Sequence, residues 1–175
     1  HPAYPDRANF GRVAMDLSME AVEQTVYEQI CALARFTSIV HVKPHGALYN
    51  RAAKDAALAR AIARGAARFS KDVILVGLAG SAMLDAFREE GLRVAAEAFA
   101  DRRYEPNGSL RSRQFNDALI RDPEEAAAQA LRLVRDGHVQ TICVHSDSPG
   151  ALEILQKITP ALRGAGIEMR SLAPL

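Results

Sequence analysis

The chain has few of the features that would place it in several common protein classes. Its two cysteines, Cys31 and Cys143, lie far apart in apolar contexts and form neither a disulfide framework nor a metal pair. The 22 lysines and arginines nearly balance the 21 aspartates and glutamates, so no charged surface for nucleic acid or a membrane is indicated. No apolar run approaches the roughly 18 residues of a membrane span, and no charged-then-apolar export segment is present. These absences favour a local functional site in a protein of the reducing cytoplasm.

The length and composition of the chain are those of one globular domain. Its 175 residues, 49% of them hydrophobic, are enough to bury a sizeable core. We therefore expect a single domain over residues 1–175. The chain opens on HPAYPDRANFGR without an initiator methionine, and Met15 lies too far inside a structured-looking stretch to be a convincing start. We expect the sequence to be an N-terminally incomplete part of a longer chain.

Apolar periodicity predicts helices that alternate with short apolar strands. Ser18 is a plausible N-cap, and Val22, Val26 and Ile30 recur at spacings of four, which predicts a helix over 19–36. The other predicted helices cover residues 51–69, 81–90, 122–136 and 151–163. The predicted strands cover residues 38–42, 72–78, 91–99 and 140–145, with a possible edge strand over 164–172.

This order of elements indicates the fold class. Strands that alternate with helices form parallel βαβ units, and continuously apolar strands are typical of a sheet covered on both faces, so the class is α/β. Periodicity does not distinguish an open sheet from a barrel, but in both the ligands bind at the carboxyl ends of the strands. Those ends carry HVKPHGALYN, GLAGS, EAFADRRY and VHSDSPG, which hold nearly every unusual polar residue of the chain.

The first strand end, HVKPHGALYN, concentrates titratable side chains. If the strand continues through Pro44, alternation places His41, Lys43 and His45 on one side of it. Such a trio suits acid/base chemistry or anion binding. Two hydrogen-bonded structural histidines with a loop-stabilising lysine, or a zinc site, are the alternatives.

The second strand end, GLAGS, places Gly77 and Gly80 at a strand-to-helix turn. Backbone amides and the helix N-terminus could face an anion there, although a tight turn that requires small residues fits equally well. No stretch of the chain is a G-x-x-x-x-G-K-[ST] phosphate loop, so no local motif indicates a nucleotide site.

The third strand end leads into a long polar segment. Its candidate residues are Glu97, Asp101, Arg102, Tyr104, Arg111 and Arg113. Arginine forks suit a carboxylate or a phosphate. Asp101 and Arg102 directly follow a buried strand, which favours a function for them, whereas Arg103, Glu105 and Arg113 are expected to be solvated loop residues.

The fourth strand end, VHSD, adds His145 and Asp147. The two residues are two positions apart, so alternation predicts that they face the same way as an acid/base or ligand pair. A structural role fits these two residues equally well.

Together these segments resemble one family, the LamB/YcsF family, whose members are also known as the A subunits of 5-oxoprolinase. The resemblance rests on HVKPHGALYN, on FADRRY followed by G-x-L-x-x-R, and on HPAYPDRANFGR, GLAGS and TICVHSD. It implies a barrel-like β/α fold similar to that of polysaccharide deacetylases. It also implies ATP-dependent opening of the lactam ring of 5-oxo-L-proline to L-glutamate, with Mg²⁺ accompanying ATP, two partner subunits and no organic prosthetic group.

The resemblance also implies which residues form the site. Its polar motif positions include His1, Tyr4, Asp6 and Arg12 of the opening stretch. The residues to which we assign catalysis are Lys43, His45, Asp101, His145 and Asp147. The residues to which we assign substrate or phosphate binding are His1, Tyr4, Arg12, Tyr49, Asn50, Gly77, Gly80, Arg102, Tyr104 and Arg111.

Three features of the chain depart from the family pattern. An acidic DLN-x-D-x-G-E-like strand and a GFH-x-G-like strand, with which family members begin, are absent, and a barrel without its first strands cannot close. The connection between Val139 and Gln140 is shorter than the pattern predicts. Ser146 stands where the pattern has glycine, which argues against close backbone approach of a ligand at that point.

The expected chemistry requires charge neutralisation and a positioned water, because an unstrained amide is a poor electrophile. In our hypothesis Lys43 and Arg102 hold anionic oxygens, while His45, His145 or Asp101 handles the proton of the attacking water. One alternative is a metal-dependent hydrolase of the deacetylase kind, in which His1, His45 or His145 holds a divalent cation. The other alternative is a subunit that binds substrate without catalysing its conversion.

Overall fold

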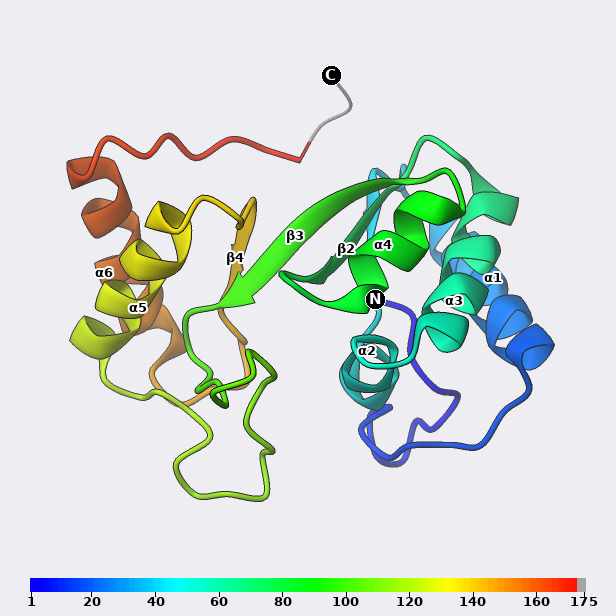
Figure 1. Ribbon diagram of the computed structural model, residues 1–175, viewed down its shortest axis with the longest axis horizontal. Helices are drawn as coiled ribbons and strands as arrows, with labels where there is room; N and C mark the ends of the chain where they lie inside the picture. The colour runs from blue at the N-terminus through cyan, green and yellow to red at the C-terminus, as the bar shows by residue number, and fades with distance from the viewer. Residues whose placement is uncertain (173–175) are drawn as a thin grey trace. The chain divides into compact units, whose positions relative to one another are not determined.

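The computed structural model describes residues 1–172, and these form two compact units. The first unit comprises residues 1–96 together with Leu172, and the second comprises residues 97–171. Helices alternate with strands along both units (Figure 1). The strand order β1-β2-β3-β4 follows the order of the strands along the chain, as expected for successive βαβ units.

The first unit holds most of the elements. They are α1 (Met19–Ala34), β1 (His41–Val42), α2 (Gly46–Ala52), α3 (Ala56–Phe69), β2 (Ile74–Leu78), α4 (Ala82–Glu89) and the first half of β3 (Arg93–Phe99). Strands β1 and β2 are parallel, with His41 opposite Ile74. The Ser18 hydroxyl accepts a hydrogen bond from the Ala21 backbone N–H, which confirms Ser18 as the N-cap of α1.

Two predictions for this unit are wrong in detail. The single helix over 51–69 is two helices, because the Asp55 carboxylate accepts hydrogen bonds from the N–H groups of Ala57 and Leu58 and begins a new helix there. The strand over 38–42 contains only two residues and ends at Val42. Extended pairing therefore does not continue through Pro44, and α2 begins directly after His45.

Helices α1 and α3 pack side by side and bury the core of the first unit (Figure 1). Val22, Val26 and Ile30 of α1 are buried, as the fourfold spacing predicts. Gly65 of α3 lets the helices approach closely, because a Cβ atom there would lie 2.5 Å from the Glu23 carbonyl oxygen. Outside this seam, Arg64 and Arg68 both form ion pairs with the Glu23 carboxylate.

The second unit packs two helices against a parallel strand pair. Its elements are the end of β3, α5 (Pro123–Arg135), β4 (Thr141–Cys143) and α6 (Ala151–Gly164). Strands β3 and β4 are parallel, with Glu97 opposite Thr141 and Phe99 opposite Cys143. The Asp122 side chain accepts a hydrogen bond from the Glu124 N–H, and Pro123 follows it at the start of α5.

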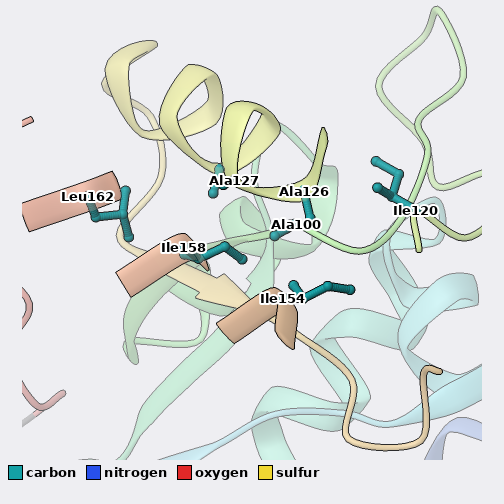
Figure 2. Close-up of a cluster of buried hydrophobic side chains, with 8 residues drawn as sticks. Ala100, Ile120, Ala126, Ala127, Ile154, Ile158 and Leu162 are labelled. Carbon is teal, nitrogen blue, oxygen red and sulfur yellow. The ribbon is translucent and has the colours of Figure 1, made fainter. Parts of the chain in front are cut away.

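The core of the second unit lies between α5, α6 and the exit of β3. It consists of Ala100, Ile120, Ala126, Ala127, Ala130, Ile154, Ile158 and Leu162, most of which are drawn in Figure 2. Alanines on α5 leave room for the larger side chains of α6 to reach across. The possible edge strand over 164–172 is not formed, because Gly164 ends α6 and residues 165–172 contain no strand.

Candidate functional site

A buried carboxylate at the exit of β3 is the centre of the candidate site in the second unit. Asp101 is 0% exposed and lies two residues beyond the end of β3. Its Oδ2 accepts hydrogen bonds from the His145 backbone N–H at 3.0 Å and from the Ser148 hydroxyl at 2.8 Å. The His145 ring nitrogen Nδ1 lies 3.0 Å from Oδ1 and 2.9 Å from Oδ2. The carboxylate therefore binds the backbone and the side chain of the same histidine.

The charge of Asp101 follows from these contacts. Burial alone would raise the pKa of Asp101, but the hydrogen bonds and charge of His145, with the hydrogen bond of Ser148, lower it below its usual value. An ionised carboxylate only accepts hydrogen bonds, so Nδ1 of His145 carries the proton and Nε2 presents the lone pair of the neutral ring. The His145 side chain is 22% exposed. Asp101 and His145 thus have the arrangement of an oriented general base.

Neighbouring side chains fix the imidazole and the strand exit. The Phe99 ring stacks on the His145 ring with centroids 5.3 Å apart and an interplanar angle of 12°. The Gln129 side-chain amide of α5 donates to the carbonyls of Phe99, Ala100 and Arg102. Gln129 thereby holds the backbone on both sides of Asp101.

The sequence did not identify Gln129 or Ser148 as site residues. Both are buried polar residues, Gln129 at 8% and Ser148 at 6% exposure. Neither belongs to a recognisable motif. A polar residue within the apolar stripe of α5 is the one signal that could have indicated Gln129.

Tyr104, Arg102 and Arg111 bind protein groups near the strand exit. The Tyr104 hydroxyl accepts a hydrogen bond from the Phe99 N–H at 2.7 Å, and burial raises the pKa of Tyr104 to about 12. The buried Arg102 donates from Nη2 to the Arg111 carbonyl at 2.6 Å. The Arg111 guanidinium pairs with Glu105 and Asp117, which occupies it within the loop. The ion pair of Arg103 with Glu125 agrees with the solvated role expected for Arg103.

Asp147 does not pair with His145 as the alternation argument predicted. Strand β4 ends at Cys143, and residues 146–147 form a turn, so the period of two no longer applies. Asp147 is exposed and lies 3.9 Å from Arg113, measured from Oδ2 to Nη1. The partner of His145 is Asp101.

In the first unit a second polar group surrounds His45. The His45 backbone N–H donates to the Pro2 carbonyl at 2.9 Å, and its ring Nε2 lies 3.1 Å from the Phe10 carbonyl. Because a carbonyl only accepts, Nε2 carries the proton and Nδ1 the lone pair. Burial lowers the pKa of His45, helped by the positive charges of Arg12 and Lys43, against the opposing effect of the Phe10 carbonyl.

The other predicted residues of this unit lie around the same loop. The His1 and His45 rings stack with centroids 6.4 Å apart. Lys43 Nζ lies 5.8 Å from the centroid of the buried Tyr49 ring. Arg12 and the exposed Asn50 line one shallow hollow. The opening stretch also holds two buried oxygen atoms without a hydrogen-bond partner among the described residues, Tyr4 Oη and Asp6 Oδ2.

Two glycines bring the opening loop against the start of α2. Gly11 and Gly46 both have left-handed backbone conformations, with φ of 66° and 62°. A Cβ atom at Gly46 would lie 2.5 Å from the Gly11 carbonyl oxygen. That same oxygen accepts a hydrogen bond from the Ala47 N–H at 3.0 Å. Glycine at both positions therefore places the loop next to His45.

The GLAGS turn is built for close packing. A Cβ atom at the buried Gly77 would lie 2.7 Å from the Met83 sulfur, so Gly77 lets α4 approach β2. Gly80 has a φ of 72° and open space around it. The Ser81 hydroxyl donates to the Leu78 carbonyl at 2.7 Å and closes the turn. Anion binding at Gly77 and Gly80 stays a prediction.

Two searches of residues 1–172 bear on the wider functional classes. Within that range no three or more His, Cys, Asp or Glu side chains are grouped in a way that could hold a metal ion. No helix in the same range is both long and apolar enough to span a membrane. Cys31 and Cys143 are free thiols.

Comparison with known proteins places the chain among well-defined relatives. The sequence profile of the LamB/YcsF family matches residues 1–175. The chain is 48% identical to the 5-oxoprolinase A subunit of Chloroflexus aggregans, over 98% of this chain and 75% of that protein. It is 45% identical to the protein of the same name from Bordetella pertussis, with the same coverage.

A solved structure shows the same fold. The lactam utilization protein from Thermus thermophilus superposes with a TM-score of 0.87 at 41% identity, over 97% of this chain and 74% of that chain. The match confirms the predicted α/β, barrel-like fold class.

Proposed function

The chain belongs to the LamB/YcsF family, and we propose that it serves as the A subunit of a 5-oxoprolinase. In this proposal it takes part in the ATP-dependent hydrolysis of 5-oxo-L-proline to L-glutamate, together with two partner subunits. The observation that carries the proposal is the buried Asp101 carboxylate that orients His145. This pair provides the base that ring opening requires, on a chain about half identical to proteins named for the reaction.

The proposed reaction needs a base that later acts as an acid. Transfer of the γ-phosphoryl group of ATP to the lactam oxygen releases ADP and makes the ring carbon electrophilic. Water then adds to that carbon and gives up a proton, and the C–N bond breaks as the ring nitrogen takes up a proton. A second water hydrolyses the resulting acyl phosphate to L-glutamate and phosphate.

His145 suits both proton transfers. Its Nε2 accepts the proton of the attacking water, and the resulting imidazolium is stabilised by the adjacent Asp101 carboxylate. The same Nε2–H then protonates the ring nitrogen as it leaves. Asp101 keeps its charge throughout, because its hydrogen bonds hold its pKa low.

The remaining roles concern charge. We assign Lys43 and Arg102 to anionic oxygens, since both are cationic and neither is fully exposed. His45 is the weaker candidate base, because its Nε2 is engaged by the Phe10 carbonyl. It is better suited to hold the opening loop in place.

The experiment that tests this function measures glutamate formation from 5-oxoproline. The complete gene product is assayed alone and with its two presumed partner subunits, each with and without MgATP. The proposal expects glutamate only when ATP and the partners are both present. Hydrolysis of an amide without ATP, lost on chelation, would instead establish a metal-dependent hydrolase.

A further inference from the structure

Ser148 is a buried hydroxyl aimed at the candidate base. The residue is 6% exposed, and its Oγ lies 2.8 Å from Oδ2 of Asp101. Because the ionised carboxylate only accepts, the hydroxyl is the donor. The hydrogen bond crosses 47 positions in the chain, so tertiary structure and not local turn geometry creates it.

The turn after β4 places this hydroxyl. The Ser148 N–H donates to the His145 carbonyl at 3.1 Å, and the Ala151 N–H at the start of α6 donates to the Ser148 carbonyl at 3.2 Å. One residue therefore links the His145 backbone, the first turn of α6 and the Asp101 carboxylate. Ser148 cannot move without moving one of these three groups.

We propose that Ser148 is a positioning residue that acts through Asp101 to hold His145 in its reactive orientation. Three donors converge on Oδ2 of Asp101: the His145 N–H, the His145 Nδ1–H and the Ser148 hydroxyl. With the Ser148 donor in place the carboxylate cannot rotate about its χ2 bond without breaking a hydrogen bond. The imidazole tautomer with Nε2 available is fixed as a result.

The hydroxyl also tunes the basicity of His145. A hydrogen bond from Ser148 disperses part of the Asp101 charge, so its loss leaves a carboxylate that stabilises the imidazolium more strongly. His145 is the charged neighbour of Asp101, and the Phe99 ring on its other contact face is uncharged. The nearest ion pair in the same turn, Asp147 with Arg113, is exposed. Removing the hydroxyl should therefore raise the pH at which His145 becomes protonated.

The test compares three variants of the complete gene product with its partner subunits. Ser148→Ala removes the hydroxyl, Ser148→Thr keeps it, and Ser146→Ala removes an exposed hydroxyl from the same turn as the control. Ser148→Ala is expected to lower kcat for glutamate formation about tenfold or more while KM changes less than twofold, because a hydrogen bond to a charged group is lost. Its acid limb of the rate profile should move to higher pH. Ser146→Ala should match the wild type, and Ser148→Thr should recover most of the rate.

A second measurement is independent of the proposed reaction. Nitrogen NMR of the His145 ring reports its tautomer and titration in the isolated chain, whether or not glutamate is formed. The proposal expects the Nε2-available tautomer in the wild type and an upward shift of the titration midpoint in Ser148→Ala. An unchanged His145 titration in Ser148→Ala would overturn it. If Ser148→Ala does not fold, Ser148→Cys, which has nearly the same volume and is a much weaker donor, carries the same expectation.

Discussion

At the scale of single residues, the site depends on a carboxylate that stays charged while buried. Burial would raise the pKa of Asp101, and the donors from His145 and Ser148 reverse that effect. Because the folded pKa lies below the unfolded one, these contacts stabilise the fold above the unfolded pKa of about 3.9. That stability is lost as the pH falls through the folded value.

Gly46 tests how tightly the opening loop is held against α2. In Gly46→Ala the new Cβ would add a left-handed backbone strain of about 1–2 kcal/mol and a contact of 2.5 Å with the Gly11 carbonyl. We expect a loss in the free energy of unfolding of about 3 kcal/mol, because overpacking typically costs a further 1–3 kcal/mol. Urea unfolding measures it.

Gly108→Ala is the matched control for this change. Gly108 has a φ of 80° and open space around it, so it shares the backbone strain without the clash. The difference between the two variants isolates the steric contact. Equal losses for both would show that the Gly11 carbonyl can move away and that the loop is not held by this approach.

Single residues also show how far the sequence could be interpreted. Asp101 and His145 were both candidates, since each follows a strand, but alternation paired His145 with Asp147. The turn at 146–147 removes that period, and the true pairing connects residues 44 positions apart. Ser148 could not be recognised, because one serine in a polar loop has no pattern of its own.

At the scale of elements, α5 does more than cover the sheet. Its Gln129 reaches the carbonyls of Phe99, Ala100 and Arg102, and so ties the helix to the irregular backbone after β3. Regular strand pairing does not satisfy such carbonyls, and buried polar groups need partners.

Gln129→Leu should destabilise the second unit because it leaves these carbonyls unsatisfied. Each buried polar group that loses its partner costs about 1–3 kcal/mol, so we expect a loss of at least about 2 kcal/mol. Thermal unfolding followed by circular dichroism measures it. Gln156→Leu, on an exposed position of α6, is the control and should change stability by less than about 0.5 kcal/mol. A loss of the same small size in Gln129→Leu would contradict this role.

Element boundaries were predictable where a capping signal was recognised. Ser18 and Asp122 were expected as helix starts and act as N-caps. Asp55 has the same role, but it lies within an alanine-rich run whose propensity masks the break. The strand expected over 164–172 failed because its apolar residues were too few to compete with irregular structure.

At the scale of the whole molecule, the family and fold class followed from short motifs spread along the chain. Membership in the LamB/YcsF family and the match to a solved lactam utilization protein confirm both. The assignment of chemistry to particular side chains is the part that motifs could not provide. It rests on the geometry of Asp101, His145 and the residues that hold them.

The most direct test of this account is the rate of ATP-dependent glutamate formation by Asp101→Asn in the complex with partner subunits. An asparagine keeps the size of the side chain but loses the charge that fixes the His145 tautomer and stabilises its protonated form. We predict a fall in kcat of at least about a hundredfold, as for loss of a general base, with Asp136→Asn, an exposed change in the same unit, at the wild-type rate. A folded Asp101→Asn variant that keeps most of the wild-type rate would contradict the account.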